Sequence, residues 1–110
     1  MRRIALIACL ALPGVAQAED WTLMTGEEIG IALTDRTLQY KSASQTFYAS
    51  GKTLYDSGRP SWGYWEVRGD QYCSTWPPND LWACYDMDRQ GDRLRFVGQG
   101  DDITEATYAD

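Results

Sequence analysis

The sequence has no histidine and few basic residues, and both scarcities exclude classes of function. Without histidine the chain cannot build the Ser/His or Cys/His nucleophile pairs of common hydrolases. Its 10 Lys and Arg residues are outnumbered by 16 Asp and Glu residues, which gives a formal net charge of −6. Because affinity for nucleic acid rests on Lys and Arg contacts to phosphate, we expect no nucleic-acid partner.

Long apolar runs are also missing. The apolar stretch from Ile4 to Leu12 is far shorter than the roughly 20 residues that span a bilayer, so we expect no stable membrane span. This stretch follows Arg2-Arg3 and precedes Ala16-Gln17-Ala18, a small-x-small cleavage site. The pattern predicts a signal peptide over residues 1–18 and a soluble, exported domain over 19–110, either periplasmic or secreted.

A second interpretation of the N-terminus is a lipoprotein signal. Leu6-Ile7-Ala8-Cys9 is similar to a lipobox, in which Cys9 would be lipidated and become the first mature residue. That would leave an apolar region of Ile4 to Ala8, shorter than the roughly 7 to 15 residues of signal peptides. We therefore favour cleavage after Ala18, which removes two arginines and no acid and moves the net charge from −6 to −8.

Cysteine is scarce, with three residues in the chain. Cys9 leaves with the signal peptide, so Cys73 and Cys84 remain as a pair in an oxidising compartment. Two cysteines without any histidine lack the four ligands that zinc prefers, and we expect no metal site. The sequence predicts a Cys73–Cys84 disulfide, which reinforces a domain that buries only about 60 to 65% of its unfolded surface.

The mature chain predicts one helix followed by strands. Thr25-Gly26-Glu27-Glu28 fits a capping box, and apolar residues at helical spacing follow, which predicts a helix over about 26–35. From Thr37 the apolar period becomes two and turn formers recur. Strands are expected at 37–41, 45–49, 53–56, 62–68, 71–76, 81–87, 93–97 and 103–108. The prediction is an α+β domain, mostly an antiparallel β meander curled into a small barrel or bent sheet, with one N-terminal helix.

The register of the hairpin at Gly69-Asp70 decides which side chains face inward. A two-residue turn pairs Val67 with Tyr72 and puts Cys73 on the face opposite to Trp65. A three-residue turn puts Cys73 on the same face as Trp65 and Val67. We expect the three-residue turn, because it would place the disulfide against Trp65 in the core.

Aromatic residues are present in excess. Five tryptophans and seven tyrosines are more than a core of this size can enclose. In one arrangement Trp62, Trp65 and Trp82 form the core, and tyrosines cover its rim. In the other, aromatic side chains line an exposed patch or a barrel mouth, where they would stack on sugar or contact a protein partner. The candidate ligand-binding or partner-binding residues are Trp62, Tyr64, Tyr72, Trp76 and Tyr85.

Carboxylates supply the remaining catalytic chemistry. Glu66, Asp70, Asp86 and Asp88 cluster in the sequence, and a pair of acids is the minimum that a small hydrolase would need. Acids at turns are mostly solvated, however, and a domain of this size rarely supplies a deep cleft. The glycine motifs that bind nucleotide phosphates are absent. We therefore expect no catalytic residue and no cofactor.

Three segments of the mature chain carry a recognisable pattern. They are Thr25-Gly26-Glu27-Glu28-Ile29 with Ala32-Leu33-Thr34 and Arg36-Thr37, then Tyr48-Ala49-Ser50-Gly51-Lys52-Thr53-Leu54-Tyr55, and Gly63-x-Trp65-x-Val67-x-Gly69-Asp70-x-Tyr72-Cys73-x-x-Trp76-Pro77 followed by Cys84-Tyr85. By these segments the chain resembles a group of small exported bacterial proteins of unknown function. Some of these are labelled dihydrodipicolinate reductase, an activity that requires a dinucleotide-binding βαβ unit for which this chain has neither the glycines nor the length.

The sequence therefore favours a non-catalytic binding or accessory protein of the periplasm. Its aromatic-rich surface would contact an unknown protein or small-molecule partner. The alternatives are a small carboxylate-dependent hydrolase and a purely structural accessory protein of the envelope.

Overall fold

The helix α1 (Gly26–Leu33) begins where the sequence predicts. In the computed structural model, which describes residues 20–110, the Thr25 hydroxyl accepts from the Glu28 amide and Glu28 Oε1 accepts from the Thr25 amide, at 3.2 and 2.8 Å. This confirms the capping box. The helix ends two residues before the predicted end, because Asp35 adopts a φ of 58°, a left-handed conformation that interrupts a right-handed helix. The predicted signal peptide and Cys9 lie outside the described residues.

The structure has nine strands within residues 20–110; the last eight correspond to the predicted strands, whereas the short one before the helix was not predicted. They are β1 (Thr22–Leu23), β2 (Arg36–Gln39), β3 (Ser44–Phe47), β4 (Lys52–Asp56), β5 (Pro60–Arg68), β6 (Gln71–Thr75), β7 (Ala83–Gln90), β8 (Arg93–Val97) and β9 (Ile103–Tyr108). From β2 to β9 each strand pairs antiparallel with the next one along the chain, which confirms the meander.

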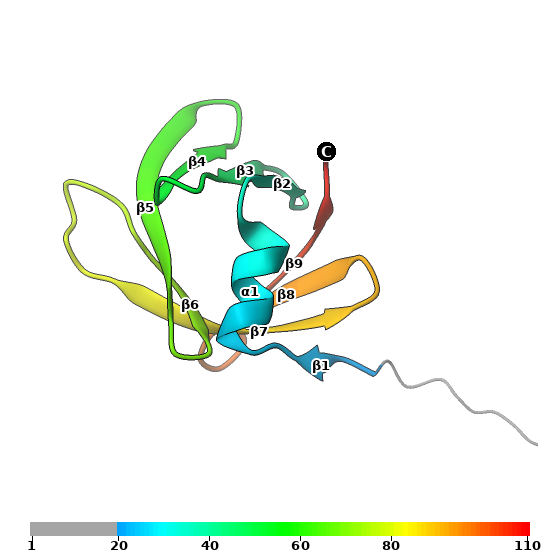
Figure 1. Ribbon diagram of the computed structural model, residues 1–110. Helices are drawn as coiled ribbons and strands as arrows, with labels where there is room; N and C mark the ends of the chain where they lie inside the picture. The colour runs from blue at the N-terminus through cyan, green and yellow to red at the C-terminus, as the bar shows by residue number, and fades with distance from the viewer. Residues whose placement is uncertain (1–19) are drawn as a thin grey trace, which may run out of the picture.

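Pairing between β2 and β9 closes the meander into a barrel that encircles α1 (Figure 1). Leu38 lies opposite Tyr108, and the Tyr108 hydroxyl donates a 2.8 Å hydrogen bond to the Ala32 carbonyl of α1. The short strand β1 pairs with the end of β7, where Thr22 lies opposite Arg89. Of the two predicted shapes, the small barrel is therefore the one that the chain adopts.

The β5–β6 hairpin has a two-residue turn, which corrects the predicted three-residue turn. Val67 pairs with Tyr72 and Glu66 pairs with Cys73, so Cys73 lies on the opposite face of the wall from the buried Tyr72. Gly69 adopts a φ of 57° at the first turn position, as tight hairpins with glycine there require. The prediction was wrong because it assumed that a buried disulfide must lie beside Trp65; Cys73 is fully buried, but on the other face of the wall.

The Cys73–Cys84 disulfide is confirmed, with an S–S distance of 2.05 Å. The two cysteines lie directly opposite each other in β6 and β7. The disulfide therefore links two neighbouring strands on the face of the wall opposite to Tyr72, with Cys73 fully buried and Cys84 exposed.

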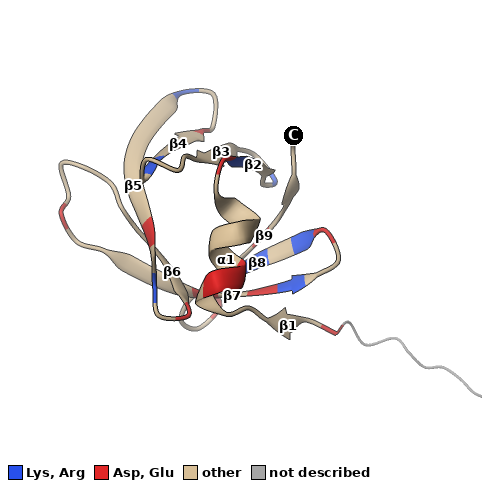
Figure 2. Cartoon of the chain, viewed as in Figure 1, with Lys and Arg blue, Asp and Glu red and all other residues tan. Residues whose placement is uncertain are grey.

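Charged residues are spread over the strands and turns of the barrel and the first turn of α1 (Figure 2). The first turn of α1 is acidic, with Glu27 and Glu28 near the positive end of the helix dipole. On the β7–β8 hairpin Arg95 forms two hydrogen bonds to Asp88, at 2.9 and 2.7 Å. Within residues 20–110, none of the helices has the length and apolar character needed to cross a membrane.

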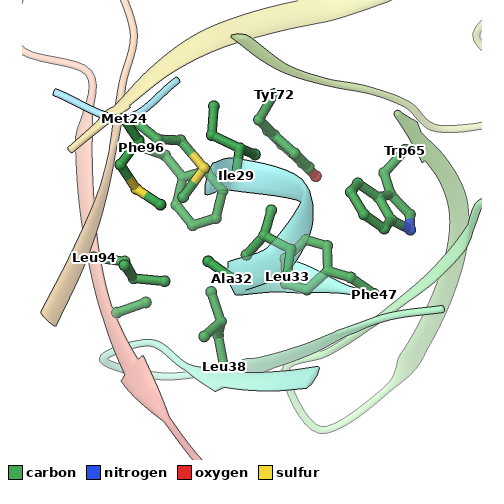
Figure 3. Close-up of a cluster of buried hydrophobic side chains, with 12 residues drawn as sticks. Met24, Ile29, Ala32, Leu33, Leu38, Phe47, Trp65, Tyr72, Leu94 and Phe96 are labelled. Atoms are coloured by element: carbon green, nitrogen blue, oxygen red, sulfur yellow. The ribbon is translucent and has the colours of Figure 1, made fainter. Parts of the chain in front are cut away.

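The buried core fills the part of the barrel that holds α1 (Figure 3). It consists of Met24, Ile29, Ala32, Leu33, Leu38, Phe47, Trp65, Tyr72, Met87, Leu94, Phe96 and Ala106. The arrangement in which three tryptophans form the core is wrong for two of them. Trp65 is 7% exposed, but Trp62 and Trp82 are 53% and 37% exposed. Trp62 alternates with inward-facing residues of β5, and Trp82 precedes β7 and lies beneath the Arg68 guanidinium, 4.4 Å from the ring centroid.

Candidate functional site

A cavity of about 380 Å³ opens inside the barrel, away from α1. Each of the eight barrel strands, or the residue beside it, contributes at least one lining side chain. The lining residues are Tyr40, Gln45, Tyr55, Ser61, Tyr72, Ser74, Trp76, Tyr85, Phe96 and Thr104. The cavity is therefore a product of barrel closure, because no single hairpin supplies more than a part of its wall.

Strand alternation explains how these residues reach the cavity. Along β6, Tyr72 and Ser74 face inward and Trp76 continues the same face just after the strand. In β8 the inward-facing positions are Leu94 in the core and Phe96 at the cavity. The barrel interior thus changes from an apolar half around α1 to a mixed aromatic and polar half.

Tyr72 and Phe96 form the boundary between the two halves. Both belong to the buried core around α1, and both line the cavity. Their ring centroids lie 5.0 Å apart in an edge-to-face arrangement, which is a favourable geometry for aromatic pairs. These two rings are the floor of the cavity.

The remaining aromatic residues extend this floor into a continuous wall. Trp76 contacts Tyr55 at 6.2 Å between ring centroids, Tyr55 contacts Tyr40 at 6.1 Å, and Tyr40 contacts Phe96 at 6.0 Å. On the other side Tyr85 contacts Tyr72 at 6.4 Å. Six aromatic side chains, the two floor rings and these four, therefore surround the cavity in one chain of ring contacts.

A hydrogen-bond network lies beneath the wall, centred on the buried amide of Gln45. The Tyr40 hydroxyl donates to Gln45 Oε1 at 2.7 Å, and Gln45 Nε2 donates to Thr53 Oγ1 at 2.8 Å and to the Tyr72 hydroxyl at 3.2 Å. The Thr53 hydroxyl in turn donates to the Thr46 carbonyl at 2.8 Å. Each polar group here is partnered, so the network holds the two tyrosine hydroxyls in fixed positions.

The lining carries no charge. None of the ten lining residues is Lys, Arg, Asp or Glu. Burial raises the pKa of Tyr40 and of Tyr72, and burial together with the nearby Asp102 raises the pKa of Tyr85. These three phenols therefore stay neutral at physiological pH, and the cavity offers hydroxyl and amide groups against aromatic surface.

Gly63 sets the position of Trp76. A Cβ atom at Gly63 would lie 2.5 Å from Trp76 Cε3 and 2.7 Å from the Thr75 carbonyl oxygen. The indole ring can lie against the barrel wall because position 63 has no side chain. This role explains a glycine in the middle of a strand, where it otherwise weakens pairing.

The five predicted binding residues divide between the two faces of the barrel wall. Tyr72, Trp76 and Tyr85 line the cavity. Trp62 and Tyr64 lie on the outer face and are 53% and 46% exposed. Trp62 stacks on Tyr48 at 6.0 Å with an interplanar angle of 28°.

Tyr48 and Trp62 form what we call the outer aromatic patch. They border a shallow surface depression, together with Asp35, Ala49, Ser50 and Lys52. The patch lies on the outside of the wall and shares no residue with the cavity. The two sets of aromatic residues are therefore separate candidate sites.

Seven residues that line the cavity were not among the binding residues predicted from the sequence. They are Tyr40, Gln45, Tyr55, Ser61, Ser74, Phe96 and Thr104. Most come from strands remote from the tryptophan-rich segment and carry no motif of their own. The signal that could have found them is the alternation of each strand, once closure of the meander is assumed.

The candidate catalytic acids all have partners outside the cavity. Glu66 pairs with Arg68, Asp70 accepts from the Gly26 amide, Asp86 accepts from Gln71, and Asp88 pairs with Arg95. Among residues 20–110, no group of three or more His, Cys, Asp and Glu side chains could hold a metal ion.

Comparison with known proteins finds no matching family model, no matching curated protein and no matching solved structure. The chemistry of the cavity is therefore the basis on which a function can be assigned.

Proposed function

We propose that this chain is an exported, non-catalytic protein that binds a small uncharged molecule in the barrel cavity. The observation that carries the proposal is the cavity of about 380 Å³ with its aromatic wall and uncharged polar lining. This volume lies within the range of small-molecule sites, about 300 to 1,000 Å³. Such sites combine mostly apolar surface with a few polar groups that orient the ligand.

The uneven filling of the barrel supports binding over a purely structural role. Eight-stranded barrels are either filled by side chains or hold one small ligand. Here α1 and the core residues fill one half of the interior, whereas the other half stays open. The open half is also where Gln45 and Ser74 bring buried polar groups into the wall.

The geometry gives little support to the carboxylate-dependent hydrolase. A glycosidase needs two carboxyl groups that face each other across the substrate. Asp70 and Asp88, like the other candidate acids, are engaged at the helix end or on the outer face, and none lines the cavity.

The outer aromatic patch supports a second candidate function, contact with a protein partner. Trp62 is more than half exposed, and its ring is already oriented by stacking on Tyr48. Rigid, exposed aromatic residues are typical anchors of protein interfaces. Co-purification from the periplasm with tagged chains tests this candidate: Trp62→Ala should lose the partner and Trp76→Ala should retain it.

Export is part of the proposal. It rests on the sequence of residues 1–18 and is supported by the Cys73–Cys84 disulfide, since disulfides persist in oxidising compartments. Intact-mass measurement of the exported protein distinguishes a chain that begins at Glu19 from one lipidated at Cys9.

The binding proposal is tested with a variant that fills the cavity. Ser74 is 6% exposed and lines the cavity, so Ser74→Phe should block it. Ser44, on the outward-facing side of β3, provides the matched control Ser44→Phe. In a thermal-shift and NMR screen of neutral small molecules, the wild type and Ser44→Phe should share ligands that Ser74→Phe loses. Equal binding to all three chains, or binding to none, would contradict the proposal.

A further inference from the structure

We infer that the ligand of the barrel cavity is an uncharged polyhydroxylated ring, a pyranose sugar. This inference rests on the proposed binding function of the cavity. Three properties of the lining carry it: its lack of charge, the hydrogen-bonding capacity that its hydroxyl groups retain, and the mutual tilt of its aromatic rings.

The lack of charge excludes acidic and basic ligands. A carboxylate, phosphate or ammonium group that enters the cavity would lose water without gaining an ionic partner, since no lining residue carries charge. Asp102 lies near Tyr85 and contributes to the raised pKa of that phenol, but it does not line the cavity. Sugar acids and amino sugars should therefore be rejected in favour of their neutral counterparts.

The hydrogen-bond network leaves one fixed acceptor toward the cavity. Because the Thr53 hydroxyl donates to a backbone carbonyl, its oxygen must accept from Gln45 Nε2, and this sets the orientation of the amide. Gln45 Oε1 then faces Tyr40, and the Tyr40 hydroxyl uses its proton as the donor. The Tyr40 oxygen therefore retains acceptor capacity.

Tyr72 supplies the complementary donor. Its oxygen accepts from Gln45 Nε2 at 3.2 Å. Because Tyr72 is the acceptor in this bond, its hydroxyl proton can be donated to a ligand. Neighbouring hydroxyl groups of a sugar, each both donor and acceptor, satisfy Tyr40 and Tyr72 together.

The rim adds hydroxyl groups that an apolar ligand would leave without partners. Within residues 20–110, the side-chain hydroxyls of Tyr55, Ser61 and Thr104 make no hydrogen bond to another protein group, and Ser61 and Thr104 are exposed to solvent. A hydrocarbon ring would exclude water from them and offer nothing in return, which disfavours such a ligand. A site that presents hydrogen-bonding groups rejects analogues that lack the matching hydroxyl.

The tilt of the rings favours a sugar over a flat nucleobase. Trp76 and Tyr55 meet at 76°, Tyr40 and Phe96 at 67°, and Tyr72 and Phe96 at 68°, while Tyr40–Tyr55 and Tyr72–Tyr85 meet at 32° and 37°. A flat base is best held between parallel ring faces, and none of these five ring pairs is parallel. A pyranose instead directs C–H bonds to several sides, where they meet the negative faces of differently oriented rings.

The test uses neutral pyranosides with matched probes. Methyl glucopyranoside, mannopyranoside and galactopyranoside are compared with glucuronate, glucosamine, cyclohexylmethanol and uracil, by NMR shifts of the Gly63 and Ser74 amides. At least one neutral pyranoside should bind with a Kd of about 1 mM or tighter. The charged sugars should bind about tenfold or more weakly in comparison.

Variants locate the binding. Tyr72→Phe removes the donor and Ser61→Ala removes a rim hydroxyl without touching the core, so both should weaken pyranoside binding severalfold. Tyr64→Phe, on the outer face, should leave binding unchanged. Ser74→Phe should abolish it.

The outcomes separate the two proposals. Uracil or cyclohexylmethanol bound in the cavity without any pyranoside would overturn the sugar inference and leave the binding function standing. If Ser74→Phe and Ser61→Ala both bound the pyranoside as tightly as the wild type does, the sugar would bind outside the cavity and the inference would be overturned. No binding by any probe or by any molecule of the neutral screen would overturn both.

Discussion

Asp70 Oδ1 accepts a hydrogen bond from the backbone amide of Gly26, 2.7 Å away. Gly26 is the first residue of α1, and Asp70 lies in the turn between β5 and β6, 44 positions later in the chain. The bond satisfies one of the free N–H groups of the helix and places a carboxylate at the positive end of its dipole. The helix inside the barrel is thereby attached to the barrel wall.

This attachment predicts opposite effects for two glycines of the same helix. A Cβ atom at Gly26 would lie 2.0 Å from the Gly69 carbonyl oxygen, whereas one at Gly30 would meet no atom within 4 Å. Gly26→Ala should lower the free energy of unfolding by about 3 kcal/mol, because the helix must move away from the turn. Gly30→Ala should raise it by about 1 kcal/mol. Urea unfolding of both variants measures the difference, and similar effects at the two positions would contradict it.

The disulfide should stabilise the fold through the unfolded chain. Cys73 and Cys84 are 11 positions apart, for which loop-closure entropy gives about 3 kcal/mol. The double variant Cys73→Ala, Cys84→Ala should lose about this much free energy of unfolding and keep the β-sheet circular dichroism of the wild type. The control is thiol titration of the unreduced, denatured mature chain. Two reactive thiols would contradict the prediction.

Alkaline pH should destabilise the protein through Tyr40 and Tyr72. Burial raises the pKa of both phenols in the folded state, whereas in the unfolded chain they ionise near pH 10. Above about pH 10 the unfolded state binds fewer protons, so the free energy of unfolding decreases as pH rises. The slope is up to about 1.4 kcal/mol per pH unit for each phenol.

Urea unfolding across this pH range measures the slope. Tyr40→Phe should reduce it by the contribution of one phenol, in addition to a pH-independent loss of the hydrogen bond to Gln45. An unchanged slope in Tyr40→Phe would refute the assignment.

Two tryptophans of the same strand should behave differently. Trp65 is buried, contacts Phe47 at 5.6 Å between centroids, and donates from Nε1 to the Tyr48 carbonyl at 2.9 Å. Trp65→Ala should cost about 3 to 5 kcal/mol of stability. Trp62→Ala should change stability by no more than about 0.5 kcal/mol.

Fluorescence quenching by iodide provides an independent check on these two positions. Trp62→Phe should reduce the iodide-accessible emission, and Trp65→Phe should reduce the shielded emission. The reverse assignment would show that the register of β5 differs from the one described.

Gly63→Ala should displace Trp76. The added methyl group would lie 2.5 Å from the indole ring, so the ring must shift from its place at the cavity wall. We expect a loss of about 1 to 3 kcal/mol in stability and a changed Trp76 emission. The double variant Gly63→Ala, Trp76→Ala should recover part of the lost stability, and no recovery would mean that the clash with the Thr75 carbonyl dominates.

Local chemistry made much of the fold predictable. The capping residues Thr25 and Glu28 fixed the start of the helix, and turn formers such as Gly69 separated the strands. The pairing of Cys73 with Cys84 followed from the small number of cysteines. These features depend on short-range or combinatorial constraints that a sequence carries directly.

The facing of the strands was not predictable in the same way. Trp62 and Trp65 are both large and aromatic, and hydrophobicity alone does not tell which one faces inward. A disulfide between directly opposite strand residues also fits either face, and Cys73 lies on the face opposite to Tyr72. Closure through β2 and β9 joins segments about 70 residues apart. The alternating pattern of one strand does not indicate which distant strand it pairs with.

The shared floor of Tyr72 and Phe96 links the two halves of the barrel interior. A larger or smaller side chain at Ile29 in α1 would shift the core against these rings and so change the depth of the cavity. Substitutions in the core could therefore move the floor of the cavity while the residues at its entrance stay the same. Mutations at residues that do not contact the ligand could therefore change which ligand is preferred. A comparison limited to the residues that line the cavity would miss such changes.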